Sequence, residues 1–134
     1  MIFKGINQST LRDLLDEAGI ATKKDDDGDL MTVLSADDDF PYDMIAWFMV
    51  EDNWLTIITR SFDFKVKDPY TVANEYNRTH RAVSCIAEDD AVFFKLGFLL
   101  DEEVSTQYVI ENCLRFGVGC SWHSFADIWK AQNS

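Results

Sequence analysis

The chain has 134 residues, of which 47% are hydrophobic, and this is enough for one domain to bury a core without disulfides or metals. Twelve basic residues oppose 24 acidic ones, and the net charge of −12 excludes the clustered cations that nucleic-acid binding requires. An anionic membrane repels the same charge, and no run of about 18 apolar residues is present to span one. The three cysteines and the lack of a signal-peptide pattern predict reduced thiols and a cytoplasmic location for a single domain, residues 1–134.

The first half of the chain predicts one helix and three strands. Apolar residues from Leu11 to Ala18 recur at helical spacing, with Ser9 as the expected N-cap and Gly19 as the stop. After a charged loop, two apolar runs are joined by a tight turn at 51–53. The alternation of Phe62, Phe64 and Val66 favours an extension of the third strand. The predicted strands cover 30–35, 44–50 and 54–60.

The middle of the chain predicts a second helix and a hairpin. Asp68 suits the cap of this helix and Pro69 its first position. Two asparagines lie at the end of this helix, and hydrogen bonds to nearby main chain would account for both. Asn77 is expected to end the helix and Asn74 to bind a neighbouring loop. The strands that follow cover 82–88 and 91–100, with a turn at the two aspartates between them.

The last part of the chain predicts a long helix. The acids at 101–103 suit the positive end of its dipole. Gly117 and Gly119 weaken its middle, so a kink or break is expected there. The resulting order is α-β-β-β-α-β-β-α. We therefore expect an α+β fold with a five-stranded antiparallel sheet and helices packed mainly on one face.

With this order of elements the chain resembles the YbjN-like family of bacterial sensory transduction regulators. The resemblance rests on the paired asparagines Asn74 and Asn77, the hairpin from Ala82 to Leu100, and the helix from Val104 to Phe116. It implies the fold of type III secretion chaperones, which are often dimeric and bind an extended protein segment. It brings no catalytic residue to this chain, and the aromatic tail from Trp122 to Trp129 departs from the family pattern.

The run from Met44 to Val50 contains no polar residue, whereas a strand with one wet face should alternate. We therefore expect this strand to be covered on both faces. The domain's own helices are one cover, and the other is the C-terminal helix, a dimer mate or a bound peptide. Ile45, Trp47 and Met49 share one face of the strand and are the candidate protein-binding or dimer surface.

Two constellations near the C-terminus suggest an enzyme instead. Cys113, Cys120, His123 and Asp127 would share one stripe of an unbroken helix, which resembles a set of metal ligands. Ser121 with His123 and Asp127 lacks the usual geometry of a nucleophile set, because the three lie along one short segment. The alternative function is therefore a small metal-dependent enzyme or hydrolase that uses His123 with Cys113 or Cys120.

The acidic loop at 25–29 is not an EF-hand. Setting Gly28 as the sixth loop position puts Lys23 first and Leu34 twelfth, where carboxylates are required.

The main prediction is a non-enzymatic, chaperone-like adaptor or regulator that acts through protein contacts as a homodimer. It would take a protein or peptide client and need no cofactor or metal.

Overall fold

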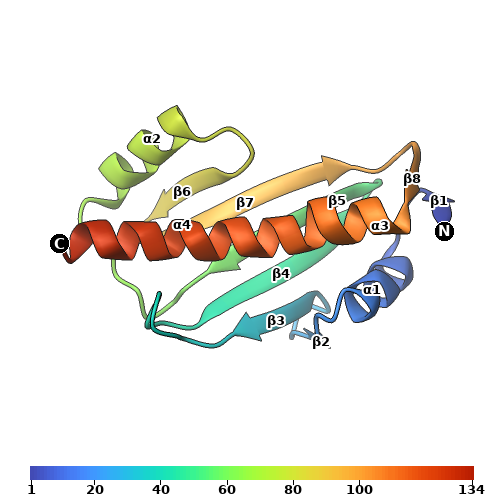
Figure 1. Cartoon of the computed structure of the whole chain (residues 1–134), viewed down its shortest axis with the longest axis horizontal. Coiled ribbons are helices and arrows are strands. Elements are labelled where there is room, and N and C mark those ends of the chain that lie inside the picture. The colour runs from blue at the N-terminus through green and yellow to red at the C-terminus, as the bar shows by residue number, and fades with distance from the viewer.

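A six-stranded antiparallel sheet forms the centre of the computed structural model, which describes all residues from 1 to 134 (Figure 1). The strand order is β2-β3-β4-β5-β7-β6. These strands are Lys23–Lys24 (β2), Leu30–Leu34 (β3), Met44–Glu51 (β4), Trp54–Arg60 (β5), Ser84–Glu88 (β6) and Ala91–Leu99 (β7). Two further strands, Ile2–Lys4 (β1) and Glu103–Ser105 (β8), pair with each other in a separate two-stranded sheet.

The helices pack on one face of the large sheet. They are Gln8–Glu17 (α1), Pro69–Thr79 (α2), and a continuous C-terminal helix made of Thr106–Val109 (α3), the π-helical segment Ile110–Arg115 (η1) and Phe116–Gln132 (α4). Figure 1 shows this last helix running across the whole sheet. The predicted α+β class and the one-sided helix layer are confirmed. None of the helices combines the length and the hydrophobicity that crossing a bilayer requires.

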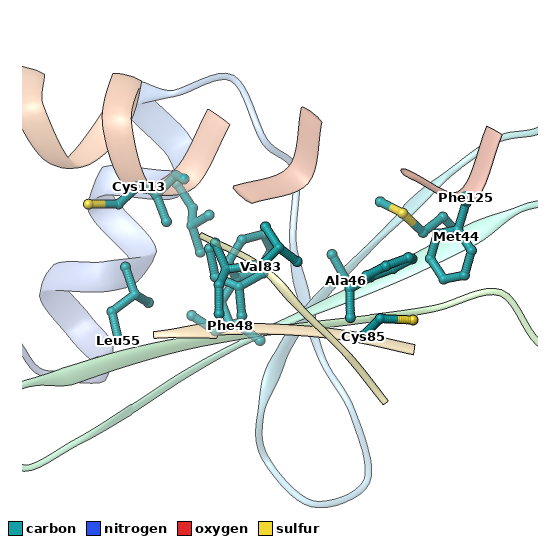
Figure 2. Close-up of a cluster of buried hydrophobic side chains, with 14 of the residues drawn as sticks. Met44, Ala46, Phe48, Leu55, Val83, Cys85, Cys113 and Phe125 are labelled. Atoms are coloured by element: carbon teal, nitrogen blue, oxygen red, sulfur yellow. The ribbon is translucent and has the colours of Figure 1, made fainter. Parts of the chain in front are cut away.

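The core lies between the helices and the sheet, and strand periodicity selects its residues. Met44, Ala46 and Phe48 on β4 are fully buried, and they alternate with residues that point to the other side of the sheet. Phe125 of α4 meets Phe94 of β7 edge to face, with ring centroids 4.7 Å apart. Figure 2 shows Met44, Ala46, Phe48 and Phe125 gathered in this cluster.

Gly117 sets how closely the C-terminal helix approaches the sheet. A Cβ atom at this position would lie 2.7 Å from Cδ1 of Ile57 and 3.1 Å from Cδ1 of Leu96. The absence of a side chain therefore lets α4 lie directly on β5 and β7, and this contact explains a glycine in the middle of a helix.

The turn between β4 and β5 forms as predicted. Asp52 and Asn53 both have positive φ, at 51° and 66°, which is the geometry that two-residue hairpin turns need and that Asp and Asn tolerate. The Asn53 side-chain oxygen also accepts a hydrogen bond from the Ile6 amide at 3.1 Å, so this turn holds the segment before α1.

Several predicted boundaries are wrong. Asn7, not Ser9, caps α1, because its side-chain oxygen accepts from the Thr10 amide. The acids before the last helix do not begin it, since 103–105 pair with β1 and Ser105 is the cap. The stretch at 62–66 is a loop in which Phe64 and Val66 are buried without being a strand. The large sheet has six strands rather than five, because β2 is an added strand of two residues.

The expected break at Gly117 and Gly119 is also wrong. The helix continues through both glycines, and its irregularity lies one turn earlier, in the π-helical segment η1. A π-helix bonds each residue to the one five positions away, so it widens the helix without interrupting it.

Candidate functional site

One face of the large sheet carries apolar side chains that no helix covers. The registers between strands place these residues together, and we call them the open face. Helices occupy only the opposite face (Figure 1). The open face consists of Lys23, Met31, Val33, Ile45, Trp47, Met49, Glu51, Trp54, Thr56, Ile58, Arg60, Ile86, Glu88, Phe93, Lys95 and Leu99.

The three candidate residues from the sequence lie near the middle of the open face. Ile45, Trp47 and Met49 are half-buried between neighbouring strands, and Trp47 also packs edge to face against Phe62 of the loop after β5. Farther out, Trp54 is 48% exposed and Leu99 46% exposed. Of the three covers that the sequence left open for this side of β4, the C-terminal helix lies on the other face. A run of apolar residues without alternation here reflects a sheet face that the chain itself leaves bare.

The charges on the open face nearly balance. Arg60 lies 4.0 Å from the centre of the Phe93 ring and forms an ion pair with Glu88. The other charged residues are Lys95, Glu51 and Lys23, which pairs with Met31 at the β2 end of the sheet, and none of the three takes part in an ion pair. Within the face itself the two signs are therefore mixed, whereas the acidic loop at 25–29 lies at its border.

The acidic loop borders the open face and closes on itself. One oxygen of Asp25 accepts from the amides of Asp27 and Asp29, each at 2.9 Å, and the other accepts from Nε1 of Trp47 at 3.1 Å. Burial, followed by the charges of Asp25 and Asp27, raises the pKa of Asp29. The loop is thus a turn that Asp25 organises, and it fixes the orientation of the Trp47 ring.

The residues of the enzyme alternative are brought together only in part. Cys113 is fully buried in the core, where burial raises its pKa to about 11, and Ser121 is also buried. His123 and Asp127 are exposed, and they share a depression on the helix side of the sheet with Cys120. No group of three His, Cys, Asp or Glu side chains in the chain has an arrangement that could hold a metal ion.

That depression contains a residue which the sequence did not connect with the others. His80, which follows the last residue of α2, lines it together with His123 of α4, so both histidines of the chain border the same depression. They are 43 positions apart, and no periodicity links them, because their common location depends on how α2 is placed on the sheet.

The two asparagines of α2 have different roles. The Asn77 side chain donates to the Cys85 carbonyl at 2.8 Å and accepts from the Cys85 amide at 2.7 Å. It therefore occupies main-chain groups on the outer edge of β6, as a neighbouring strand would. Asn74 is exposed and makes no side-chain hydrogen bond, so its predicted bond to a loop is wrong, and α2 ends two residues after Asn77.

The fold and its one bare sheet face define the class: an α+β protein in which an antiparallel sheet has helices on one side only. The family model described as "Putative bacterial sensory transduction regulator", YbjN, matches residues 7–116. The chain belongs to the YbjN family.

The comparison with solved structures gives the same fold. The crystal structure of YbjN from E. coli, described as "a putative transcription regulator", superposes with a TM-score of 0.62 at 16% sequence identity. The match covers 96% of this chain and 92% of that one. At this identity the likeness concerns the fold alone. The search of curated proteins gave no match.

Proposed function

We propose that this chain is a non-enzymatic adaptor or regulator that acts through protein contacts and forms a homodimer through the open face. The observation that carries the proposal is the bare apolar face around Ile45, Trp47 and Met49. Large exposed apolar patches are rare on monomers and mark interaction surfaces. Membership in a family of bacterial regulators supports a regulatory role.

The size of the open face suits a dimer. With strands about 4.8 Å apart and a rise of about 3.3 Å per residue, five principal strands of up to nine residues span an area of roughly 20 by 30 Å. That footprint is about 600 Å², and the relief of the side chains increases the accessible area. A standard stable interface takes about 800 Å² from each partner, so most of the open face would be used.

The charge pattern also suits self-association. Two chains that each carry −12 repel one another unless the approaching surfaces are near neutral. The open face meets this condition, since it combines Arg60 and Lys95 with Glu51 and Glu88. The contact would place aromatic and Met side chains at its centre, as in other protein interfaces.

Sedimentation equilibrium of the purified protein tests the proposal. We expect a dimer for the wild type and a monomer for Ile58→Glu, because the new carboxylate would be buried in the interface. Ile58 lies opposite Lys95 across the strands, so the introduced charge has a partner within the monomer and the fold should persist.

Tyr70→Glu is the matched control. It adds the same charge at a residue of α2 that is 71% exposed and remote from the open face, and it should leave the dimer intact. A wild type that stays monomeric at micromolar concentrations would refute the homodimer. Equal dissociation by both variants would show that added charge, not the open face, controls assembly.

A further inference from the structure

A groove separates α2 from α4 on the helix side of the sheet. It consists of two adjoining depressions of about 490 and 420 Å³, which share Tyr76, Thr79, His80 and Asp127. Each has the size of a cleft that accepts a small organic molecule. We call the larger one the apolar depression and the smaller one the charged depression, after their linings.

The apolar depression has a firm hydrophobic lining. Val72 and Tyr76 come from one side, and Ile128 and Ala131 from the other. The Tyr76 ring is held in place, because its hydroxyl shares a 2.8 Å hydrogen bond with Ser124 and its face stacks on His80 at 3.8 Å. Tyr76 is only 9% exposed, because His80 covers its ring and Phe94 packs against it, so the accessible apolar lining comes mainly from Val72 and Ala131. A lining that is fixed in this way can pack against an apolar side chain with little loss of entropy.

The charged depression offers groups of both signs that have no partner within the protein. Arg81 and His123 line it, and neither makes a side-chain hydrogen bond or ion pair. Asp127 lines both depressions and is likewise unpaired. A guanidinium and a carboxylate are thus available in one small space.

His80 has one ring nitrogen fixed and one available. Its Nδ1 lies 3.0 Å from the Tyr76 carbonyl oxygen and 2.9 Å from Oγ1 of Thr79, and these contacts occupy this nitrogen. The other nitrogen, Nε2, makes no hydrogen bond within the protein and is the one left for a ligand.

We propose that the groove binds a free α-amino acid with a large apolar side chain. The carboxylate would pair with Arg81 and the ammonium with Asp127. The side chain would lie against Val72 and Ala131 in the apolar depression. Arginine forms strong, oriented bonds to carboxylates, and these gain strength when both partners are charged. A simple anion would be repelled by Asp127 and a simple cation by Arg81, so the zwitterion is the ligand that uses both charges.

Titration calorimetry on the full chain tests this assignment with four probes. L-Phenylalanine has every required group, N-acetyl-L-phenylalanine lacks the ammonium, phenethylamine lacks the carboxylate, and L-alanine lacks the apolar body. We expect saturable binding of L-phenylalanine and at least tenfold weaker binding of the other three.

Three variants locate the site. Arg81→Ala and Asp127→Asn should each weaken L-phenylalanine binding at least tenfold, and both residues are exposed, so the fold should tolerate the changes. Arg12→Ala is the control, since this arginine is an exposed residue of α1 that lines neither depression and forms no ion pair. It should leave binding unchanged.

Three results would overturn the proposal: no saturable binding of L-phenylalanine at millimolar concentrations, equal binding of a probe that lacks one charge, or equal affinity in the Arg81→Ala variant. The groove lies on the helix side of the sheet and Ile58→Glu alters the open face, so L-phenylalanine binding is expected to persist in that variant. A failure of this proposal would therefore leave the proposed homodimer untouched, and the reverse also holds.

Discussion

Replacing Asn77 with alanine should expose the edge of β6 and destabilise the protein. The change removes two hydrogen bonds to the Cys85 main chain, at 2.7 and 2.8 Å. Each contributes about 1 kcal/mol net, so the loss is about 2 kcal/mol. Alanine recovers about 0.5 kcal/mol through its higher helix propensity. We expect the free energy of unfolding to fall by about 1.5 kcal/mol.

Asn74→Ala separates the two contributions. Asn74 lies on the same helix and is exposed, without a side-chain hydrogen bond, so its replacement keeps only the propensity gain of about 0.5 kcal/mol. The two variants should therefore differ by about 2 kcal/mol. Urea denaturation followed by tryptophan fluorescence measures this difference, with a shift between midpoints of about 1 M.

The protein concentration must be the same in all samples, because dimer formation adds to apparent stability. If the midpoints of Asn77→Ala and Asn74→Ala agree within error, the Asn77 bonds to Cys85 contribute nothing net, and the account of a protected β6 edge fails. Increased aggregation of Asn77→Ala alone would be a second sign that the edge had become free.

Further predictions concern buried polar groups and ionisation. Ser121→Ala should stabilise the protein by about 1 kcal/mol, because the buried Ser121 hydroxyl has no hydrogen-bond partner. Ser124→Ala should destabilise it by about 1 kcal/mol, because the Tyr76 hydroxyl would lose its partner. Thermal unfolding measures both changes, and a change of the same sign in both variants would contradict this reasoning. Asp29→Asn should raise the melting temperature near pH 7. The raised pKa of Asp29 means that ionisation costs stability above its folded pKa, so the gain should disappear as the pH falls below the ordinary value of 3.8, and a gain independent of pH would exclude this cause. Iodoacetamide should modify Cys120 first in the native protein, because burial raises the pKa of Cys85 to about 12 and that of Cys113 to about 11. Mass spectrometry after labelling measures the order of modification. Early modification of Cys113 would show that the core opens.

Features with a local cause could be predicted from the sequence. Asp52 and Asn53 predict a turn, because few other residue types tolerate the positive φ that both adopt there. Pro69 marks the start of α2 because it needs no amide donor there. Asp68 occupies the predicted N-cap position, but its side chain makes no capping hydrogen bond, so the sequence predicted the position of the cap and not its bonding.

Features that depend on distant partners could not be predicted. Strands β1 and β8 have three residues each and exist because they pair with each other across about 100 positions. Phe64 and Val66 alternate with polar residues as in a strand, but they lie in a loop and both side chains are buried. The alternation therefore indicated which residues are buried and not the conformation of the backbone. The common depression of His80 and His123 likewise follows from the placement of α2 on the sheet, where it packs against β6.

The apolar run at 44–50 predicted where the open face lies, but not whether another part of the chain covers it. The absence of polar residues predicted covers on both sides of β4, whereas the helices of the chain cover one side only. The sheet registers add Ile58 and Phe93 from other strands to the uncovered side. Sequence alone could not decide on which side the last helix lies, because both sides of the strand are equally apolar.

The π-helical segment makes the chain unusually tolerant of one change in length. A residue advances an α-helix by 100°, so a deletion within α4 would rotate everything after it and turn Phe125 away from Phe94. The π-turn at 110–115 already contains an additional residue, and its loss would leave an ordinary α-helix with α4 still facing the sheet. Relatives that are one residue shorter at this point can therefore keep the same helix packing, whereas those shortened by one residue beyond Gly117 would have to rebuild the core.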